Sequence, residues 1–239
     1  MSVAAARQDQ TAGWYEEYYT SKGNDRNDPL RNAGVLFQNL AFEKSIVEAL
    51  RPLKVDRSWK FLDVGCGAGF SLLRLLSYGL EPEQMYGIDI VESRIARGRR
   101  RQPALNLTVG DAAAMEYPSN SFHLAMESTM FIQITDENMA QSIASEMVRV
   151  VKPGGFIMLT DWRYSFGKAG YLALSPERIA RLFGVGSQTS VVCQAHGALL
   201  PPLGRATSRY LPSLYFPLCR LLPFLVGQVT VVLQKGLAE

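Results

Sequence analysis

A buried strand that runs directly into alternating glycines constrains this chain more than any other feature. Residues 61–64 form an apolar run that contains Asp63, and a helical pattern begins at Ser71. Three glycines lie between the run and the helix: Gly65, Gly67 and Gly69. Glycine takes positive φ without strain and lets a ligand lie against the main chain. The pattern therefore predicts a strand, a ligand-binding loop and a helix at the edge of a parallel sheet.

The glycine spacing argues against a nicotinamide dinucleotide site. That fingerprint needs glycines at the first, third and sixth positions of the loop. Counted from Gly65 the sixth position is Phe70, and counted from Gly67 it is Leu72. An oxidoreductase that uses a nicotinamide cofactor is therefore disfavoured.

Two later apolar runs also lead to a carboxylate. Asp89 follows the glycines by about 20 residues, where nucleotide-binding α/β folds place an acid that accepts hydrogen bonds from ribose hydroxyls. Asp111 stands at the corresponding point of the next run. Strands are expected at residues 85–90, 107–112, 121–127 and 156–160. Helical patterns separate these runs, which predicts parallel βαβ units and a doubly wound α/β sheet.

Taken in this order, the segments between about residues 60 and 160 resemble the class I S-adenosylmethionine-dependent methyltransferases, in the group called type 11. The loop resembles the Asp-x-Gly-x-Gly-x-Gly motif of that family. Residues 149–155 (RVVKPGG) are similar to its Arg-Val-Leu-Lys-Pro-Gly-Gly signature. The resemblance implies a Rossmann-like, mostly parallel seven-stranded sheet. Its sixth and seventh strands are expected at 188–194 and 229–234, with the seventh antiparallel between the fifth and the sixth.

The resemblance also implies S-adenosyl-L-methionine as the cofactor. In the family, the glycine loop holds the methionine part, the second acid binds the ribose, and an Asp-Ala pair binds adenine. The positions of this sequence that match, or that are expected to lie beside the cofactor, are Asp63, Gly65, Cys66, Gly67, Gly69, Asp89, Ile90, Asp111, Ala112, Glu127 and Tyr19.

The segments on either side of this core are expected to cover it. Residues 1–34 are interpreted as a tail and a helical lid, and 35–239 as the methyltransferase domain, which opens with a helix over about 35–50. The aromatics Tyr15, Tyr18 and Tyr19 resemble the lid that many relatives fold over the cofactor. A surface helix that packs its aromatics on the core is the alternative.

A Leu/Pro-rich insertion, residues 196–226, precedes the last strand. Its prolines are expected to break it into short helical pieces. Ligands bind outside the carboxyl ends of the strands in this fold class, so the insertion is expected to cap the acceptor or to form a subunit interface or extra core. Peripheral contact with a membrane surface is a third interpretation. No apolar stretch is long enough to span a bilayer.

Three residues are candidates for acid–base work on the acceptor. The implied reaction is an in-line attack on the sulfonium methyl, in which the protein mainly aligns the reactants. An oxygen acceptor also needs a base, and the candidates are His196, Asp161 and Glu127. Their structural alternatives are a loop residue, a turn cap and a carboxylate at a helix N-terminus. His123, at the start of a strand and far from its ligand edge, is interpreted as structural.

The composition limits the classes of partner that the chain is expected to bind. The net charge of +3 is too small to imply nucleic acid, and the arginine cluster at 94–101 is interpreted as a solvated helix face. The three widely separated cysteines indicate neither a metal site nor a disulfide framework, which suits a reducing cytoplasm. A monomer or a homodimer is expected.

Several acceptor classes are disfavoured. Amino-group DNA methyltransferases carry a Pro-Pro motif after the fourth strand, where this chain reads ESTM at 127–130. The Pro-Cys nucleophile of cytosine C5 enzymes and the paired glutamates of protein arginine methyltransferases are also missing from the sequence. We therefore expect O-methylation of a small hydroxyl-bearing metabolite or glycan intermediate. An N-methyltransferase of a small amine and a catalytically silent cofactor-binding scaffold are the alternatives.

Overall fold

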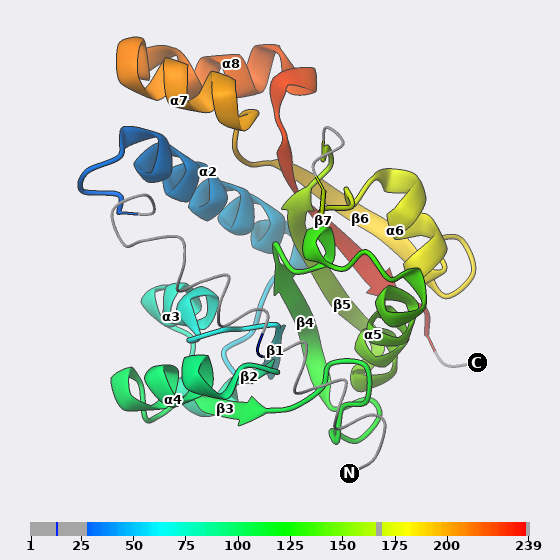
Figure 1. The fold of residues 1–239 in the computed structure, drawn as a ribbon. Helices are drawn as coiled ribbons and strands as arrows, with labels where there is room; N and C mark the ends of the chain where they lie inside the picture. The colour runs from blue at the N-terminus through cyan, green and yellow to red at the C-terminus, as the bar shows by residue number, and fades with distance from the viewer. Residues whose placement is uncertain (1–12, 14–27, 166–168, 238–239) are drawn as a thin grey trace.

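The computed structural model describes Gly13 and residues 28–165 and 169–237. The expected lid aromatics Tyr15, Tyr18 and Tyr19 lie outside the described residues, so the lid stays a prediction. In the described part, one twisted sheet runs through the centre of the molecule with helices on both faces (Figure 1).

Seven strands form this sheet in the order β3-β2-β1-β4-β5-β7-β6. The pairs from β3 to β5 are parallel, and β7 is antiparallel to both β5 and β6. The expected doubly wound sheet and the antiparallel place of the last strand are thus confirmed. The bounds are β1 Phe61–Val64, β2 Met85–Asp89, β3 Asn106–Val109, β4 Phe122–Ser128, β5 Val151–Trp162, β6 Thr189–His196 and β7 Gln228–Lys235.

Helices cover both faces of the sheet because strand side chains alternate between them. Leu62 and Val64 of β1 pack in the core that α5 and α6 close, whereas Phe61 packs in the core closed by α2, α3 and α4. The α-helices are α2 Ala33–Leu50, α3 Phe70–Ser77, α4 Glu92–Arg101, α5 Glu137–Val150, α6 Pro176–Phe183, α7 Pro201–Tyr210 and α8 Tyr215–Leu221. The 3-10 turns are η2 Arg51–Leu53, η3 Pro82–Gln84, η4 Phe131–Gln133, η5 Pro212–Leu214 and η6 Pro223–Leu225.

β6 extends to His196, so this residue ends the strand instead of opening the insertion. The start of β5 also differs from the sequence expectation. The segment 153–155 (Pro-Gly-Gly) predicts a turn before the fifth strand, but it lies inside β5, which begins at Val151. The pairing of β5 with β4 shifts register here, and Gly154 has φ +74°. The two glycines therefore form an irregular, bulged start of the strand rather than a separate turn.

The insertion between β6 and β7 is helical and lies over α2 (Figure 1). Pro201, Pro212 and Pro223 each stand at the start of a short helix, where the missing N–H has no cost, so the expected division by prolines is confirmed. Tyr215 of α8 points inward, with its ring centroid 5.0 Å from that of Phe37 on α2. The insertion thus shares a core with α2.

Candidate cofactor and acceptor site

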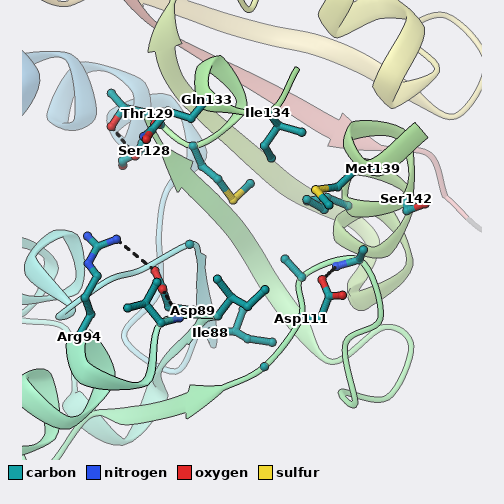
Figure 2. A pocket seen from close by; sticks show the side chains of 18 of the residues that line it. Ile88, Asp89, Arg94, Asp111, Ser128, Thr129, Gln133, Ile134, Met139 and Ser142 are labelled. Atoms are coloured by element: carbon teal, nitrogen blue, oxygen red, sulfur yellow. Dashed lines mark hydrogen bonds and ion pairs between the residues drawn. The ribbon is translucent and has the colours of Figure 1, made fainter. Parts of the chain in front are cut away.

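A cavity of about 270 Å³ opens at the carboxyl ends of the central strands (Figure 2). β2 and β4 flank β1 on opposite sides, so the winding of the chain reverses here. Such a switch point is the usual ligand site of an open α/β sheet. The lining residues are Gly65, Ile88, Asp89, Ile90, Val91, Arg94, Gly110, Asp111, Ala112, Ala113, Ser128, Thr129, Met130, Gln133, Ile134, Asn138, Met139, Ser142 and Ile143.

Asp89 joins the glycine loop to the end of β2. Its Oδ2 accepts a hydrogen bond from the backbone N–H of Gly67 (2.7 Å), and its Oδ1 accepts one from Val91 N–H (2.9 Å). The Arg94 guanidinium lies 3.6 Å from the same Oδ2, across the left side of the cavity in Figure 2. The carboxylate is therefore held in place by the backbone while one edge of it lines the cavity.

Two glycines of the loop are required by what lies against them. Gly65 has φ +71°, and a Cβ there would stand 2.8 Å from Met130 Sδ. Gly67 has φ +58°, and a Cβ there would overlap the Arg94 guanidinium. A side chain at Gly67 would therefore strain the left-handed backbone and displace the guanidinium of Arg94.

The wall of the cavity next to β3 contains the expected adenine pair. Asp111 Oδ1 accepts a hydrogen bond from Ala113 N–H (2.8 Å), which closes the turn after β3. Asp111, Ala112 and Ile90 all line the cavity. Figure 2 shows Asp111 beneath Met139 and Ser142 of α5, so this wall is built from two elements far apart in the sequence.

Two buried carboxyls lie behind the lining. Asp63 and Glu127 are fully buried, and Asp63 Oδ2 and Glu127 Oε1 have no hydrogen-bond partner in the described residues. Burial, reinforced by the charge of Asp89, raises the pKa of Asp63 to about 8. Burial and the charge of Asp161 likewise raise the pKa of Glu127 well above its ordinary value. Buried polar atoms are normally paired, so both oxygens are suited to a donor or cation on the ligand.

Asp161 is held by the backbone rather than exposed to the cavity. It is buried, with Oδ2 accepting from Ile132 N–H (2.8 Å) and Oδ1 from Trp162 N–H (2.7 Å). Burial raises its pKa, and these two hydrogen bonds oppose the rise. Asp161 therefore anchors η4 to β5, and its candidacy as a base stays a prediction.

His196 lies at the end of β6, three strands from β4 in the sheet. It pairs with Val229 and is absent from the cavity lining. At about 4.8 Å per strand, three spacings amount to roughly 14 Å from the end of β4. Burial and the positive charge of Arg163 lower its pKa. The structure does not bring His196 together with Glu127, and its role as a base also remains a prediction.

The other expected residues are placed as follows. Cys66 is buried with Sγ against Gly87, and Gly69 caps α3. His123 accepts a hydrogen bond from Lys60 N–H (2.8 Å) and stacks on Trp59, which agrees with a structural role. None of these residues lines the cavity.

The loop after β4 supplies lining residues that the sequence reasoning missed. Thr129 has φ +57°, which a β-branched residue rarely adopts. Its carbonyl accepts a hydrogen bond from Gln133 Nε2 (2.8 Å), and Met130 follows it over the glycine loop. Arg94 was missed as well, because the arginine cluster was interpreted as solvated. For Thr129 and Met130, the sequence signal is their position directly after a strand that ends at the ligand edge.

Comparison with known proteins agrees with this geometry. Residues 61–155 match the family described as "Methyltransferase domain". The chain is 26% identical over 162 residues to a demethylmenaquinone methyltransferase of Renibacterium salmoninarum, covering 67% of this chain and 62% of the relative. It is 30% identical over 165 residues to a ubiquinone/menaquinone biosynthesis C-methyltransferase of Dinoroseobacter shibae, covering 65% and 62%.

A solved S-adenosylmethionine-dependent methyltransferase from Methanosarcina mazei shares the fold, with a TM-score of 0.57 and 18% identity over 80% of this chain and 98% of that one. Together, the family match and the shared fold support a class I S-adenosylmethionine-dependent methyltransferase. The aligned part spans about three fifths of the length of these curated relatives.

The residues of the cavity fit the methyl donor of this family. A carboxylate at Asp89 suits ribose hydroxyls, and Gly65 of the glycine loop lines the cavity beside it, whereas Gly67 does not line it. The unpaired oxygens of Asp63 and Glu127 suit the cationic amino group of a methionine moiety. S-adenosylmethionine is thus the cofactor that both the family and the donor set indicate.

Neither a membrane-spanning helix nor a metal-binding cluster occurs among the described residues. None of the described helices combines the length and apolarity needed to cross a membrane. Among the same residues, no three or more His, Cys, Asp or Glu side chains are grouped so that they could hold a metal ion.

Proposed function

We propose that this chain transfers a methyl group from S-adenosylmethionine to a small molecule, and that a reduced quinone-type ring is the acceptor. The bound cofactor supplies a methyl group activated by its sulfonium charge. The observation that carries the proposal is the cavity at the switch point, lined by Asp89 at the end of β2 and by Asp111 just after the neighbouring strand β3. The names of the relatives, which act on quinone precursors, support this acceptor class.

The chemistry of the lining supports a ring carbon as the methyl acceptor. Beyond Asp89, Arg94 and Asp111, the lining residues in the described part of the chain carry no titratable side chain. The remaining side chains are apolar, such as Met130 and Met139, or neutral and polar, such as Gln133. An apolar wall favours an aromatic ring and excludes water, and neutral amides and hydroxyls orient the ring oxygens. A hydroquinone carbon is electron-rich and attacks without a base of the strength that an alcohol requires.

O-methylation of a hydroxyl-bearing metabolite remains the second candidate. Ser128, Thr129 and Ser142 present hydroxyls to the cavity that could hold an acceptor oxygen near the donor. Asp161, Glu127 and His196 are then the proposed bases. N-methylation of a small amine and a silent cofactor-binding scaffold are the further alternatives. A cytoplasmic location and a monomeric or homodimeric state are part of the same proposal.

The test is product analysis with purified protein and isotopically labelled S-adenosylmethionine. Demethylmenaquinone in its reduced form is compared with a simple phenol and a primary amine. A methyl carbon bonded to the ring in the NMR spectrum supports the proposal. A methyl ether from either oxygen acceptor would move the conclusion to the second candidate. Tight cofactor binding with no product from any acceptor would favour the scaffold.

A further inference from the structure

The insertion between β6 and β7 exposes both arginines and large apolar side chains. We call α7, η5, α8 and η6, residues 201–225, the helical hairpin. The buried face of α7 consists of small and polar residues: Gly204, Thr207 and Ser208. Its exposed residues include Arg205, Arg209 and the 69%-exposed Tyr210. α7 therefore presents two arginines and one large aromatic side chain to solvent.

α8 and its flanking turns continue this outer face. Tyr215 and Cys219 point into the core, one helical turn apart. Leu214, Leu221 and Phe224 are exposed, the last two at 74% and 62%. Leu214 lies in η5, Leu221 ends α8 and Phe224 lies in η6, so exposed apolar side chains recur on three successive elements. The hairpin therefore exposes several large apolar side chains.

All charged side chains of the helical hairpin are positive. The sequence contains no Asp or Glu between Glu177 and Glu239. Arg205, Arg209 and Arg220 are exposed, and none of the three forms an ion pair with a carboxylate within the residues that the structure describes. Exposed apolar side chains interspersed with unneutralised arginines match the chemistry of an anionic lipid surface.

We propose that the outer face of the helical hairpin docks the protein onto an anionic lipid bilayer. The apolar side chains enter the boundary between head groups and acyl chains, and the arginines bind lipid phosphates. A second copy of the chain is a poorer occupant, because a two-fold contact would oppose like charges. The hairpin leaves the carboxyl end of β6, and the cavity lies at the same edge of the sheet, so docking brings the site near the membrane (Figure 1).

The experiment is flotation of the full chain with vesicles of phosphatidylcholine alone or mixed with phosphatidylglycerol. We expect binding to the anionic vesicles that weakens as salt is raised, and little binding to the neutral ones. Because an arginine near an anionic surface contributes about 1 kcal/mol, loss of two arginines alone weakens binding by about 30-fold, and the double variant Arg209→Glu/Arg220→Glu, which also adds two repelled carboxylates, should weaken it by more than that. The apolar variant Leu221→Ser/Phe224→Ser should also release the protein.

The matched control is Arg97→Glu/Arg100→Glu on α4, which reverses the same number of exposed charges elsewhere on the molecule. It should bind anionic vesicles like the parent to within a fewfold. Loss of binding in this control but not in the hairpin variants would place the contact on α4 and overturn the proposal. So would a lack of binding to every vesicle, or a dimer in sedimentation that Leu221→Ser/Phe224→Ser dissolves. Because the readout is lipid binding, the proposal stands or falls independently of the proposed methyl transfer.

Discussion

The carboxylate of Asp89 accepts a hydrogen bond from the backbone N–H of Gly67 at 2.7 Å. This contact links the residue expected to bind the ribose to the loop expected to bind the methionine part. Because Val91 N–H donates to the other oxygen, the carboxylate has a fixed orientation before any ligand arrives. A change in the position of the Asp89 carboxylate would therefore affect both the expected ribose site and the glycine loop.

Removing this side chain should weaken the cofactor more than a single ribose contact would. Asp89→Ala is expected to reduce affinity for S-adenosylmethionine by ~1.5–3 kcal/mol, since charge-assisted hydrogen bonds are lost and the loop loses its acceptor. Titration calorimetry measures this directly. Glu92→Ala, an exposed carboxylate on the first turn of α4, is the control and should bind normally. Equal affinities in both variants would mean that the ribose is held elsewhere.

A second prediction distinguishes the effect of backbone strain on folding stability from a loss of cofactor affinity. Gly67→Ala and Gly79→Ala both place a side chain at positive φ, and each should cost about 1 kcal/mol of folding stability. At Gly79 the new Cβ meets only Arg57 at an ordinary 3.5 Å, whereas at Gly67 it overlaps Arg94. Only Gly67→Ala should therefore lose cofactor affinity, by at least about tenfold or ~1.4 kcal/mol. Thermal melts and calorimetry on the pair distinguish the effects, and comparable affinity loss at Gly79 would contradict this account.

The third prediction follows from the buried Asp63. Its folded pKa of about 8 lies above its ordinary value of 3.8, so the folded state binds more protons between about pH 4 and pH 8. The contribution of Asp63 to stability is thus complete below pH 4 and is lost as the pH rises toward 8. Asp63→Asn should flatten the fall of the melting temperature over that window. A melting profile parallel to that of the parent would show that Asp63 is already ionised.

The same carboxyl predicts proton release on cofactor binding. A cationic amino group next to Asp63 favours the carboxylate and lowers its pKa. At pH 7 the binding enthalpy should therefore differ between buffers of different ionisation enthalpy, and Asp63→Asn should remove most of the difference. Buffer-independent heats in the parent protein would argue that the amino group does not lie beside Asp63.

The fifth prediction concerns His196. A general base contributes about 10²–10⁴-fold to turnover. His196 lies three strands from β4 and outside the cavity lining, so we expect His196→Ala to retain most of the parent turnover with unchanged cofactor affinity. A drop of the size of a base contribution, with normal cofactor binding, would instead support the sequence-based proposal.

The sequence predicted part of the cavity lining, including Asp89 and Asp111, and did not predict the lining residues from the loop after β4 and from α5. Asp89 and Asp111 follow strands whose apolar runs mark the ligand edge, so their positions depend on local pattern alone. Met130 and Met139 reach the same cavity from a loop and a helix, and this depends on tertiary packing that no local pattern encodes. Arg94 shows the limit most clearly, because it shares α4 with exposed arginines yet faces the cavity.

The helical hairpin connects two strands, β6 and β7, that are neighbours in the sheet. His196 of β6 pairs with Val229 of β7, so the chain that leaves one strand returns to its direct neighbour. A tight two-residue turn could join such antiparallel neighbours, and the hairpin is an elaboration of that turn. It could be lengthened, shortened or exchanged without changing the order of the strands or the cofactor loops. The β6–β7 connection can therefore change in sequence and length during evolution. Such changes alter the surface that the protein presents to other molecules and leave the cofactor site unchanged.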